Sequence, residues 1–334
     1  MRGTSEKVGI IGAGAFGTAL AMVAAQAGRA VVIFGRDPAR VAEINEGRTN
    51  ERYLPETTLP GGISASSEPA ALAKCGIVLV AVPAQATRRV TQALAAALSR
   101  NAIIVACAKG IERQTGDRQS KILGAALPGR PLAVLSGPGF AADIAKGLPM
   151  AATIAANELE TARFVADRLA TPYFRPYASS DVAGVELSGA LKNVIAIAGG
   201  VVAGRRLGES ALAALITRGL AEMMRLADAF GAERQTLMGL SGLGDLVLTA
   251  TSLQSRNTRF GVALGEGRTA AELLNAGMPL AEGAYTAGIA ADLAARHGVD
   301  MPITAAVAAI IAGTLSVDEA IAGLVMRPLK SENA

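Results

Sequence analysis

The sequence predicts a doubly wound α/β domain over residues 1–180, followed by an all-α domain over residues 181–334. In the first half, short apolar segments typical of buried strands alternate with helical segments, which favours a mostly parallel sheet with right-handed crossovers. Near residue 180 the strand patterns stop, and helical segments punctuated by Gly or Pro follow. With 334 residues, of which 51% are hydrophobic and 18% charged, the chain is long enough for two globular domains and too apolar to be disordered.

The composition excludes several classes of function. The basic residues behind the net charge of +4 are mostly arginines scattered singly, and only 3% of residues are aromatic, so we predict no nucleic-acid surface. A mild positive balance instead suits a small anionic ligand. Cys75, Cys107 and the single histidine, His297, match no metal-binding spacing, so we expect no metal site. We interpret the cysteines as reduced core residues and His297 as an exposed helix end, and we therefore expect proton transfer without histidine.

The uncharged segment 8–28 is long enough to suggest a membrane helix. Glycines at positions 9, 12, 14 and 17 disfavour such a helix, and the segment leads directly into a second strand pattern at 30–36. A strand, a glycine turn, a helix and a second strand account for the whole stretch, so we predict no membrane span.

The glycine turn Gly12–Gly17 has the pattern GxGxxG, directly after the apolar segment VGII and directly before a helical segment. In this context Gly12 permits a tight turn, Gly14 lets a pyrophosphate approach the backbone, and Gly17 lets the helix pack closely on the strand. The free N–H groups and the dipole at the helix start then favour bound phosphate. The turn therefore predicts a Rossmann-like domain that binds a dinucleotide.

The end of the second strand indicates which dinucleotide is preferred. An acidic residue there would hold the ribose 2′-hydroxyl of NAD, but this strand ends at Arg36, whose planar guanidinium can hold the 2′-phosphate of NADP. The neighbouring Asp37 precedes Pro38 and is interpreted as the cap of the next helix. NADP(H) is favoured, and NAD(H) stays an alternative.

The α/β pattern continues to residue 180. Further strands are predicted at 77–82, 103–108, 131–135, 151–156 and 174–177, with helices at 84–99 and 158–169. In such sheets ligands bind beyond the carboxyl ends of the strands. Four segments fall at those ends, namely Gly12–Gly17, Pro83, Lys109 and Gly137–Phe140.

The helical half begins with the apolar segment Asp181–Gly204, predicted to be one helix buried on most sides. Burial lowers the pKa of a lysine, so Lys192 near its middle is a candidate proton donor or acceptor. Two alternatives stay open, namely a lysine that reaches solvent at the helix edge and one paired with Glu186, although six residues is a poor spacing for such a pair. Further helices are predicted at 209–230, 258–264, 270–275, 284–297, 301–312 and 317–324.

Three more fragments are candidates for chemistry, each with a structural alternative. Lys109 ends a buried strand at the ligand edge, or is an ordinary charge at a strand end. Asp245, in Leu240–Leu246 with Thr249 beyond it, can orient a lysine ammonium, or simply lie in the first turn of a helix. Ser255–Asn257 can bind phosphate oxygens through arginine and amide groups, or form a solvated turn.

Together these fragments resemble the bacterial-type NAD(P)-dependent glycerol-3-phosphate dehydrogenases. The resemblance covers nearly the whole chain and rests on ordered matches, namely GAGAFGTAL at 12–20, AVP at 81–83, AKGIE at 108–112, SGPGFA at 136–141, ELSGALKNVIAIAGG at 186–200, GLSGLGDL at 239–246, SRN at 255–257 and AEGAYTA at 281–287.

The resemblance implies reversible reduction of dihydroxyacetone phosphate to sn-glycerol 3-phosphate in the cytoplasm, supplying the backbone of glycerophospholipids. It implies Lys192 as general acid/base, Lys109 as a substrate-binding and polarising residue, and Asp245 as the residue that positions the catalytic amine. Thr249 and Asn193 would hydrogen-bond near the reacting centre, and Ser255, Arg256 and Asn257 would hold the phosphate. The family's cofactor positions correspond to Gly12, Gly14, Ala15, Phe16, Gly17, Arg36, Lys109, Ala141, Arg256, Leu280 and Glu282, and its substrate loop to Gly137 and Gly139.

The chain departs from the family at two positions. Ala15 replaces a serine that is frequent there, and Gly139 replaces Ser or Thr, so two hydroxyl groups are missing. A related β-hydroxyacid or 6-phosphogluconate dehydrogenase is one alternative, although Asn193 adjoins Lys192 directly instead of following it in a KxxxN arrangement. A non-catalytic NADP-binding sensor is another, disfavoured by the presence of the candidate proton carrier. The apolar helical domain favours a homodimer.

Overall fold

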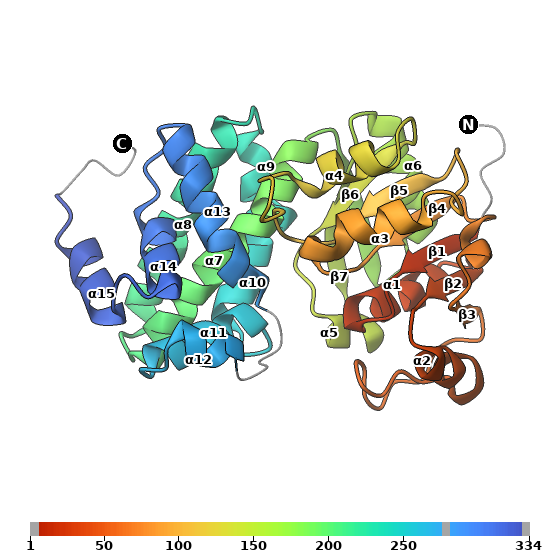
Figure 1. The fold of residues 1–334 in the computed structure, drawn as a ribbon, viewed down its shortest axis with the longest axis horizontal. Helices are drawn as coiled ribbons and strands as arrows, with labels where there is room; N and C mark the ends of the chain where they lie inside the picture. Colours follow the sequence, from red (N-terminus) through yellow and green to blue (C-terminus); the bar gives the residue numbers. More distant parts are fainter. Residues whose placement is uncertain (1–6, 276–280, 329–334) are drawn as a thin grey trace. The chain divides into compact units, whose positions relative to one another are not determined.

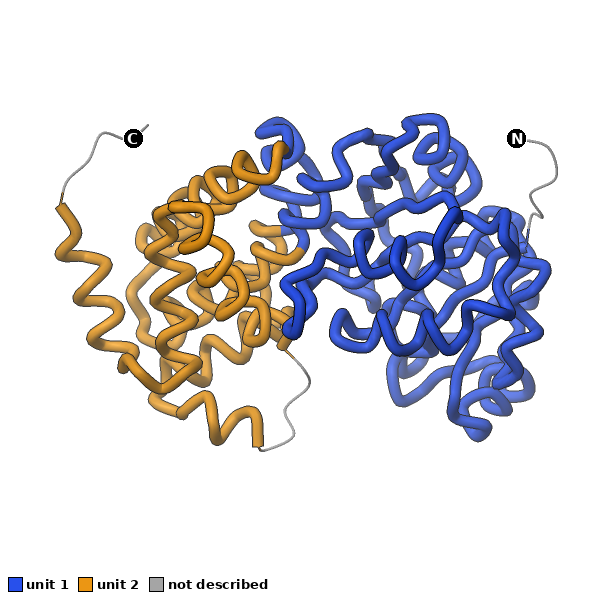
Figure 2. The backbone as a smooth tube through the Cα atoms, turned by 45° about the horizontal axis from the view of Figure 1, so that its top comes forward, with its two compact units in different colours: residues 1–189, 232–245 blue, residues 190–231, 246–334 orange. Residues whose placement is uncertain are grey.

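A computed structural model describes residues 7–275 and 281–328. The chain forms two compact units, coloured separately in Figure 2. Unit 1 contains residues 1–189 and 232–245, and unit 2 contains residues 190–231 and 246–334. Helix α7 (Val182–Gly204) and helix α10 (Asp245–Thr251) each begin in unit 1 and end in unit 2. The domain division predicted at residue 180 stays a prediction.

Within the described part of unit 1, eight strands form one sheet in the order β3-β2-β1-β4-β5-β6-β7-β8. Neighbouring strands are parallel except β6 and β7, so the prediction of a mostly parallel sheet is confirmed. The strands are β1 (Val8–Ile11), β2 (Val31–Phe34), β3 (Ile63–Ser66), β4 (Ile77–Val80), β5 (Ile103–Ala106), β6 (Leu132–Ser136), β7 (Met150–Ala155) and β8 (Phe174–Ser179). Strand β3 was not predicted, because its sequence ISAS alternates serine with two small or branched residues and lacks an apolar run.

Helices cover both faces of this sheet, as its strand sequences require (Figure 1). Alternate residues of each central strand enter two separate cores, since successive side chains point to opposite faces. Ile10, Ile33 and Leu79 join one core with helices α1 (Ala15–Gln26), α5 (Ala141–Ala145) and α6 (Leu159–Leu169). Ile11 and Val78 join the other with helices α3 (Thr87–Leu94) and α4 (Gln119–Ala126). The helix predicted at 84–99 is shorter at both ends, since a 3-10 turn at Ala84–Ala86 precedes α3 and α3 ends at Leu94.

Unit 2 is helical in its described residues, as predicted. After α7 its helices are α8 (Glu209–Asp228), α10, α11 (Arg256–Gly265), α12 (Ala270–Asn275), α13 (Glu282–Arg296), α14 (Pro302–Ala312) and α15 (Val317–Val325). Among the described residues, α7 is the one unbroken helix that is long and apolar enough to span a membrane. Most of it is buried within the protein. It therefore behaves as the core helix that the sequence predicted.

Helices α7 and α11 of unit 2 meet through glycines on both sides. A Cβ atom at Gly200 would lie 2.8 Å from the Cα atom of Gly261, and one at Gly204 would lie 3.0 Å from the Cα atom of Gly265. A Cβ at Gly261 would overlap the carbonyl oxygen of Ile197 on α7. Only glycine lets the two backbones approach this closely, which fixes how the residues of α7 and α11 face each other.

Three local predictions are confirmed. Asp37 caps helix α2 (Pro38–Ala42), since its carboxylate accepts from Ala39 N at 3.1 Å. Cys75 and Cys107 are buried free thiols, and burial raises the pKa of Cys75 to about 11 and that of Cys107 to about 12. His297 is exposed at the C-terminus of α13.

Candidate active site

The glycine turn of unit 1 has the geometry that a dinucleotide requires. Gly12 has φ of +116°, and a Cβ there would lie 2.7 Å from the carbonyl oxygen of Ala81. A Cβ at Gly17 would overlap the carbonyl oxygen of Gly12, so Gly17 allows close packing of α1 on β1. Gly14 begins α1 without a side-chain cap, and no heavy atom lies within 4 Å of where its Cβ would be. The uncapped N–H groups and the open space beside Gly14 fit a pyrophosphate.

Other predicted cofactor residues of unit 1 surround this turn. Ala15 and Phe16 form the first turn of α1, and with Ala141 they pack half-buried on the first core of the sheet. Arg36 is exposed directly after β2. The ring of Phe16 lies with its centroid 5.9 Å from Lys109 Nζ, which places the substrate-binding candidate beside the cofactor turn.

Lys109 forms a buried ion pair within unit 1. Its Nζ donates to Asp245 Oδ2 at 2.6 Å and to the carbonyl oxygen of Gly137 at 2.8 Å. The Asp245 side chain is 2% exposed and that of Lys109 is 17% exposed. Lys109 follows strand β5, whereas Asp245 begins α10 after a π-helical turn at Leu240–Gly244. Asp245 is therefore bonded to Lys109, a partner that the sequence did not identify, and its predicted role in positioning the Lys192 amine stays a prediction.

The loop after strand β6 is shaped by its glycines. A Cβ at Gly137 would lie 2.8 Å from the Cα atom of Ala152, so a larger residue would push strand β7 away. A Cβ at Gly139 would lie 2.5 Å from the sulfur of Met150. The end of the flexible Met150 side chain occupies the space in which a Ser or Thr side chain would start, so a larger residue at 139 would require Met150 to change rotamer.

Lys192 lies in unit 2 on helix α7, where it is 6% exposed. Its Nζ donates to Thr249 Oγ1 on α10 at 2.6 Å. The burial contradicts the alternative of a lysine that reaches solvent at the helix edge. Glu186 accepts instead from Ser120 N at 2.6 Å and from the Arg118 guanidinium at 3.0 Å in unit 1, and burial raises its pKa.

Asn193 and Asn257 form a second polar pair inside unit 2. Asn257 Nδ2 donates to Asn193 Oδ1 at 2.9 Å, and Asn257 Oδ1 accepts from Gly283 N at 2.9 Å. Ser255 caps α11 by accepting from Thr258 N at 3.2 Å, and it is buried. Arg256 is the exposed first residue of α11. Of the three predicted phosphate residues, Arg256 is thus the one whose side chain faces solvent.

Two predicted cofactor residues, Leu280 and Glu282, come after helix α12 in the sequence. Glu282 is the first residue of α13 and is half-buried, directly before Gly283. Leu280 lies outside the described residues. Among residues 7–275 and 281–328, no cluster of three or more His, Cys, Asp or Glu side chains could hold a metal ion.

The sequence did not identify the side chains that hold the loop after Lys109. Gln85 donates to the carbonyl oxygen of Ile111 at 2.7 Å and accepts from Arg113 N at 2.8 Å. Gln119 donates to the carbonyl oxygen of Gly110 at 2.9 Å. Arg88 makes a bidentate pair with Glu112, which lowers the pKa of that carboxyl. Polar side chains that bond to distant backbone leave no periodic signal in a sequence.

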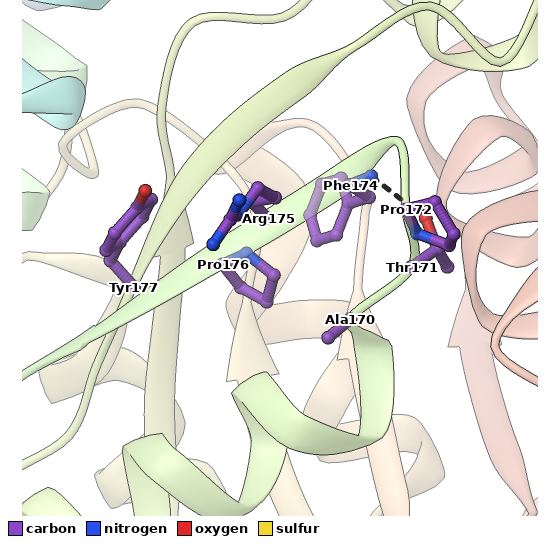
Figure 3. A pocket seen from close by; sticks show the side chains of 7 residues that line it. All are labelled: Ala170, Thr171, Pro172, Phe174, Arg175, Pro176 and Tyr177. Atoms are coloured by element: carbon purple, nitrogen blue, oxygen red, sulfur yellow. Dashed lines mark hydrogen bonds between the residues drawn. The ribbon is translucent and has the colours of Figure 1, made fainter.

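A surface pocket lies elsewhere, at the edge of the sheet in unit 1 (Figure 3). Its lining runs from Ala170 to Tyr177 around the start of edge strand β8, where Phe174 N donates to Thr171 Oγ1 at 2.9 Å. None of the residues that line this pocket is a predicted site residue. The catalytic candidates therefore lie outside this pocket.

An uncapped Gly-rich turn, a mostly parallel sheet and a helical unit with a buried lysine are typical of two-domain NAD(P)-dependent dehydrogenases. Two family models match the chain, the "NAD-dependent glycerol-3-phosphate dehydrogenase N-terminus" over residues 7–162 and its C-terminus over residues 181–322. The chain belongs to the family of NAD-dependent glycerol-3-phosphate dehydrogenases. The resemblance stated from the motifs is therefore confirmed, and the sensor and hydroxyacid dehydrogenase alternatives are not supported.

Individual relatives agree with this assignment. The chain is 53% identical over 329 residues to a glycerol-3-phosphate dehydrogenase [NAD(P)+] of Rhizobium etli, covering 98% of this chain and 100% of the relative. It is 49% identical to the enzyme of that name from Caulobacter vibrioides, covering 98% and 99%. The crystal structure of glycerol-3-phosphate dehydrogenase from Coxiella burnetii superposes with a TM-score of 0.91 at 38% identity, covering 97% of this chain and 100% of that one.

Proposed function

We propose that this chain reduces dihydroxyacetone phosphate reversibly to sn-glycerol 3-phosphate with NADPH or NADH, and that Lys192 is its general acid/base. The observation that carries the proposal is the buried Lys192 ammonium, held at 2.6 Å by Thr249 in a chain of this family. The nicotinamide cofactor, when bound, supplies the hydride for C2 of the substrate. The protein must then supply orientation, a proton and a site for the phosphate.

Lys192 is suited to move the proton at the C2 oxygen. In reduction its ammonium donates a proton to that oxygen, and in oxidation its neutral amine accepts the proton of the C2 hydroxyl. The hydrogen bond from the Lys192 amine on α7 to the Thr249 hydroxyl on α10 helps to preorganise the amine for proton transfer.

Lys109 is assigned to bind the substrate and to polarise its C2 oxygen, and Asp245 to hold the Lys109 ammonium in place. The bond of 2.6 Å from Lys109 to a carboxylate that is 2% exposed supports this assignment, since a charge-assisted hydrogen bond is short and about twice as strong as one between neutral groups. The Gly137 carbonyl oxygen accepts a second bond from the same ammonium, which ties the substrate loop to it.

The substrate phosphate is assigned to the start of α11. Backbone N–H groups at a helix N-terminus attract anions, and Arg256 adds a guanidinium in the first turn. The amide of Asn257 bonds to Asn193 and Gly283, so we assign Asn257 mainly to the alignment of α7, α11 and α13 around this start. Ser255 acts as the helix cap and, with Asn193, completes the proposed substrate-binding set.

The cofactor is assigned to the Gly12–Gly17 turn with Ala15, Phe16, Arg36 and Ala141 around it. Arg36 carries the proposed preference for NADPH, because its guanidinium can bind the 2′-phosphate that NADH lacks. Lys109, Arg256, Leu280 and Glu282 are the other residues proposed to contact the cofactor.

Initial rates of dihydroxyacetone phosphate reduction with NADPH and with NADH test this proposal in the wild type and in Arg36→Ala. We expect turnover by the wild type, and in Arg36→Ala a KM for NADPH raised about tenfold or more, because bonds to a charged group are worth about 1.5–3 kcal/mol. The KM for NADH should change little. Arg100→Ala, at an exposed arginine outside the site, is the matched control. A wild type that binds NADPH without reducing the substrate would contradict the reaction, and equal effects on both cofactors would contradict the role of Arg36.

The family to which the chain belongs suggests a wider setting. We propose that the product supplies the backbone of glycerophospholipids, that the enzyme acts in the cytoplasm, and that it forms a homodimer through its helical unit.

A further inference from the structure

Asn50 joins two parts of unit 1 that are far apart in the sequence. It follows a π-helical turn at Glu43–Gly47 and is fully buried. Its Nδ2 donates to the carbonyl oxygen of Ala13 at 3.1 Å and to Thr18 Oγ1 at 2.8 Å. A backbone carbonyl oxygen only accepts hydrogen bonds, so the amide nitrogen must face Ala13 and the amide cannot be reversed.

These two acceptors lie at either end of the proposed phosphate-binding turn. Ala13 is inside Gly12–Gly17, and Thr18 is in the first turns of α1, where its N–H donates to the carbonyl oxygen of Gly14 at 2.9 Å. Because a peptide unit is planar and trans, the bond from Asn50 to the Ala13 oxygen also fixes the direction of the Gly14 N–H. The Gly14 N–H therefore points away from Asn50. No heavy atom lies within 4 Å of where a Cβ on Gly14 would be, so there is open space beside this N–H.

Asn50 is itself held firmly. The backbone carbonyl oxygen of Asn50 accepts from Tyr53 N at 3.0 Å and from Leu54 N at 2.8 Å, and Leu54 is buried in the first core. The Arg48 guanidinium, two residues earlier, donates to the carbonyl oxygen of Ile63 at 2.7 Å. The Oδ1 atom of Asn50 is buried and meets no donor among the described residues. A buried acceptor without a donor is unfavourable for folding. The favourable contribution of asparagine at this position therefore comes from the two hydrogen bonds that its Nδ2 donates.

We propose that Asn50 is a positioning residue for the dinucleotide, which holds the Ala13–Gly14 peptide in the orientation that receives the pyrophosphate. The inference rests on the proposed cofactor site. Asn50 acts on a part that NADPH and NADH share, so it sets the affinity for both, whereas Arg36 acts on NADPH alone.

The test compares dissociation constants of NADPH and NADH, by cofactor fluorescence, and of ADP-ribose, by calorimetry, for the wild type and four variants. Asn50→Ala removes both donor bonds, and Asn50→Asp keeps the size of the side chain but only accepts. Thr18→Val is the matched control, since it removes one buried bond and leaves the Ala13 bond possible. Arg36→Ala reports on the 2′-phosphate.

We expect both Asn50 variants to raise all three dissociation constants by the same factor, about tenfold, which corresponds to about 1.4 kcal/mol. At saturating cofactor their kcat should equal that of the wild type, and Thr18→Val should stay within about twofold in every constant. If Asn50→Asp, which buries a carboxylate against two acceptors, does not fold, Asn50→Ala gives the same comparison. Asn50 variants with wild-type constants, or a Thr18→Val variant as weak as Asn50→Ala, would overturn the role of Asn50. A wild type that binds none of the three ligands would instead overturn the cofactor site.

Discussion

Replacement of Lys192 by alanine is expected to lower kcat for dihydroxyacetone phosphate reduction by about 10²–10⁴-fold, the usual contribution of a positioned general acid or base. No other residue of α7 can replace the lost amine, because Lys192 is the only lysine or arginine between residues 182 and 204. The dissociation constant of NADPH should stay close to that of the wild type. Steady-state rates and cofactor fluorescence measure the two quantities.

Two variants serve as controls for this result. Thr249→Val keeps the amine but removes its hydrogen-bond partner, and a decrease in kcat of about tenfold is expected because the amine loses a fixed orientation. Lys74→Ala removes an exposed lysine outside the site and should leave kcat unchanged. A Lys192→Ala enzyme with wild-type kcat would show that the proton comes from another group.

Replacement of Gly261 by alanine is expected to destabilise the protein by about 1–3 kcal/mol, or more if the helices cannot separate. The new methyl group would overlap the carbonyl oxygen of Ile197 and lie 2.9 Å from the Cα atom of Gly200, so α11 must move away from α7. The two helices carry Asn257 and Asn193, whose hydrogen bond should weaken as well. Urea and thermal unfolding measure the change in the free energy of unfolding.

Gly288→Ala is the matched control, because this glycine also lies inside a helix, α13, but has no heavy atom within 4 Å of its missing Cβ. Alanine there should stabilise the protein by about 0.5–1 kcal/mol, the difference in helix propensity. If both substitutions changed the free energy of unfolding in the same direction and amount, close contact between α7 and α11 would not be the reason for the glycines.

Much of the fold could be predicted because its signals are local. The GxGxxG turn, the apolar runs of the central strands and the buried helix α7 can each be predicted from a pattern within one short segment. Strand β3 could not be predicted, because ISAS has no continuous apolar run and is defined by pairing with β2. Helix α11 begins at Arg256, earlier than predicted, because Ser255 supplies its cap.

Candidate site residues could be named from the sequence, but their bonding partners could not. Lys109, Lys192 and Asp245 carry recognisable sequence surroundings, yet the bond between Lys109 and Asp245 joins residues separated by 136 positions. Nor does the sequence reveal that the end of the Met150 side chain lies against Gly139. Such contacts depend on the packing of strands and loops that are distant in the chain, so only the folded structure reveals them.

Chemical rescue of Lys192→Ala tests most directly whether an amine at this position carries the proton. Reduction of dihydroxyacetone phosphate by the variant is measured at saturating NADPH with increasing concentrations of small primary amines of different pKa, with Thr249→Val and wild type in parallel. The account predicts that the rate of Lys192→Ala rises with amine concentration, with a slope that depends on amine pKa, while wild type and Thr249→Val do not respond. A Lys192→Ala enzyme that binds NADPH and substrate normally, yet shows the same rate at every amine concentration and pKa, would contradict it.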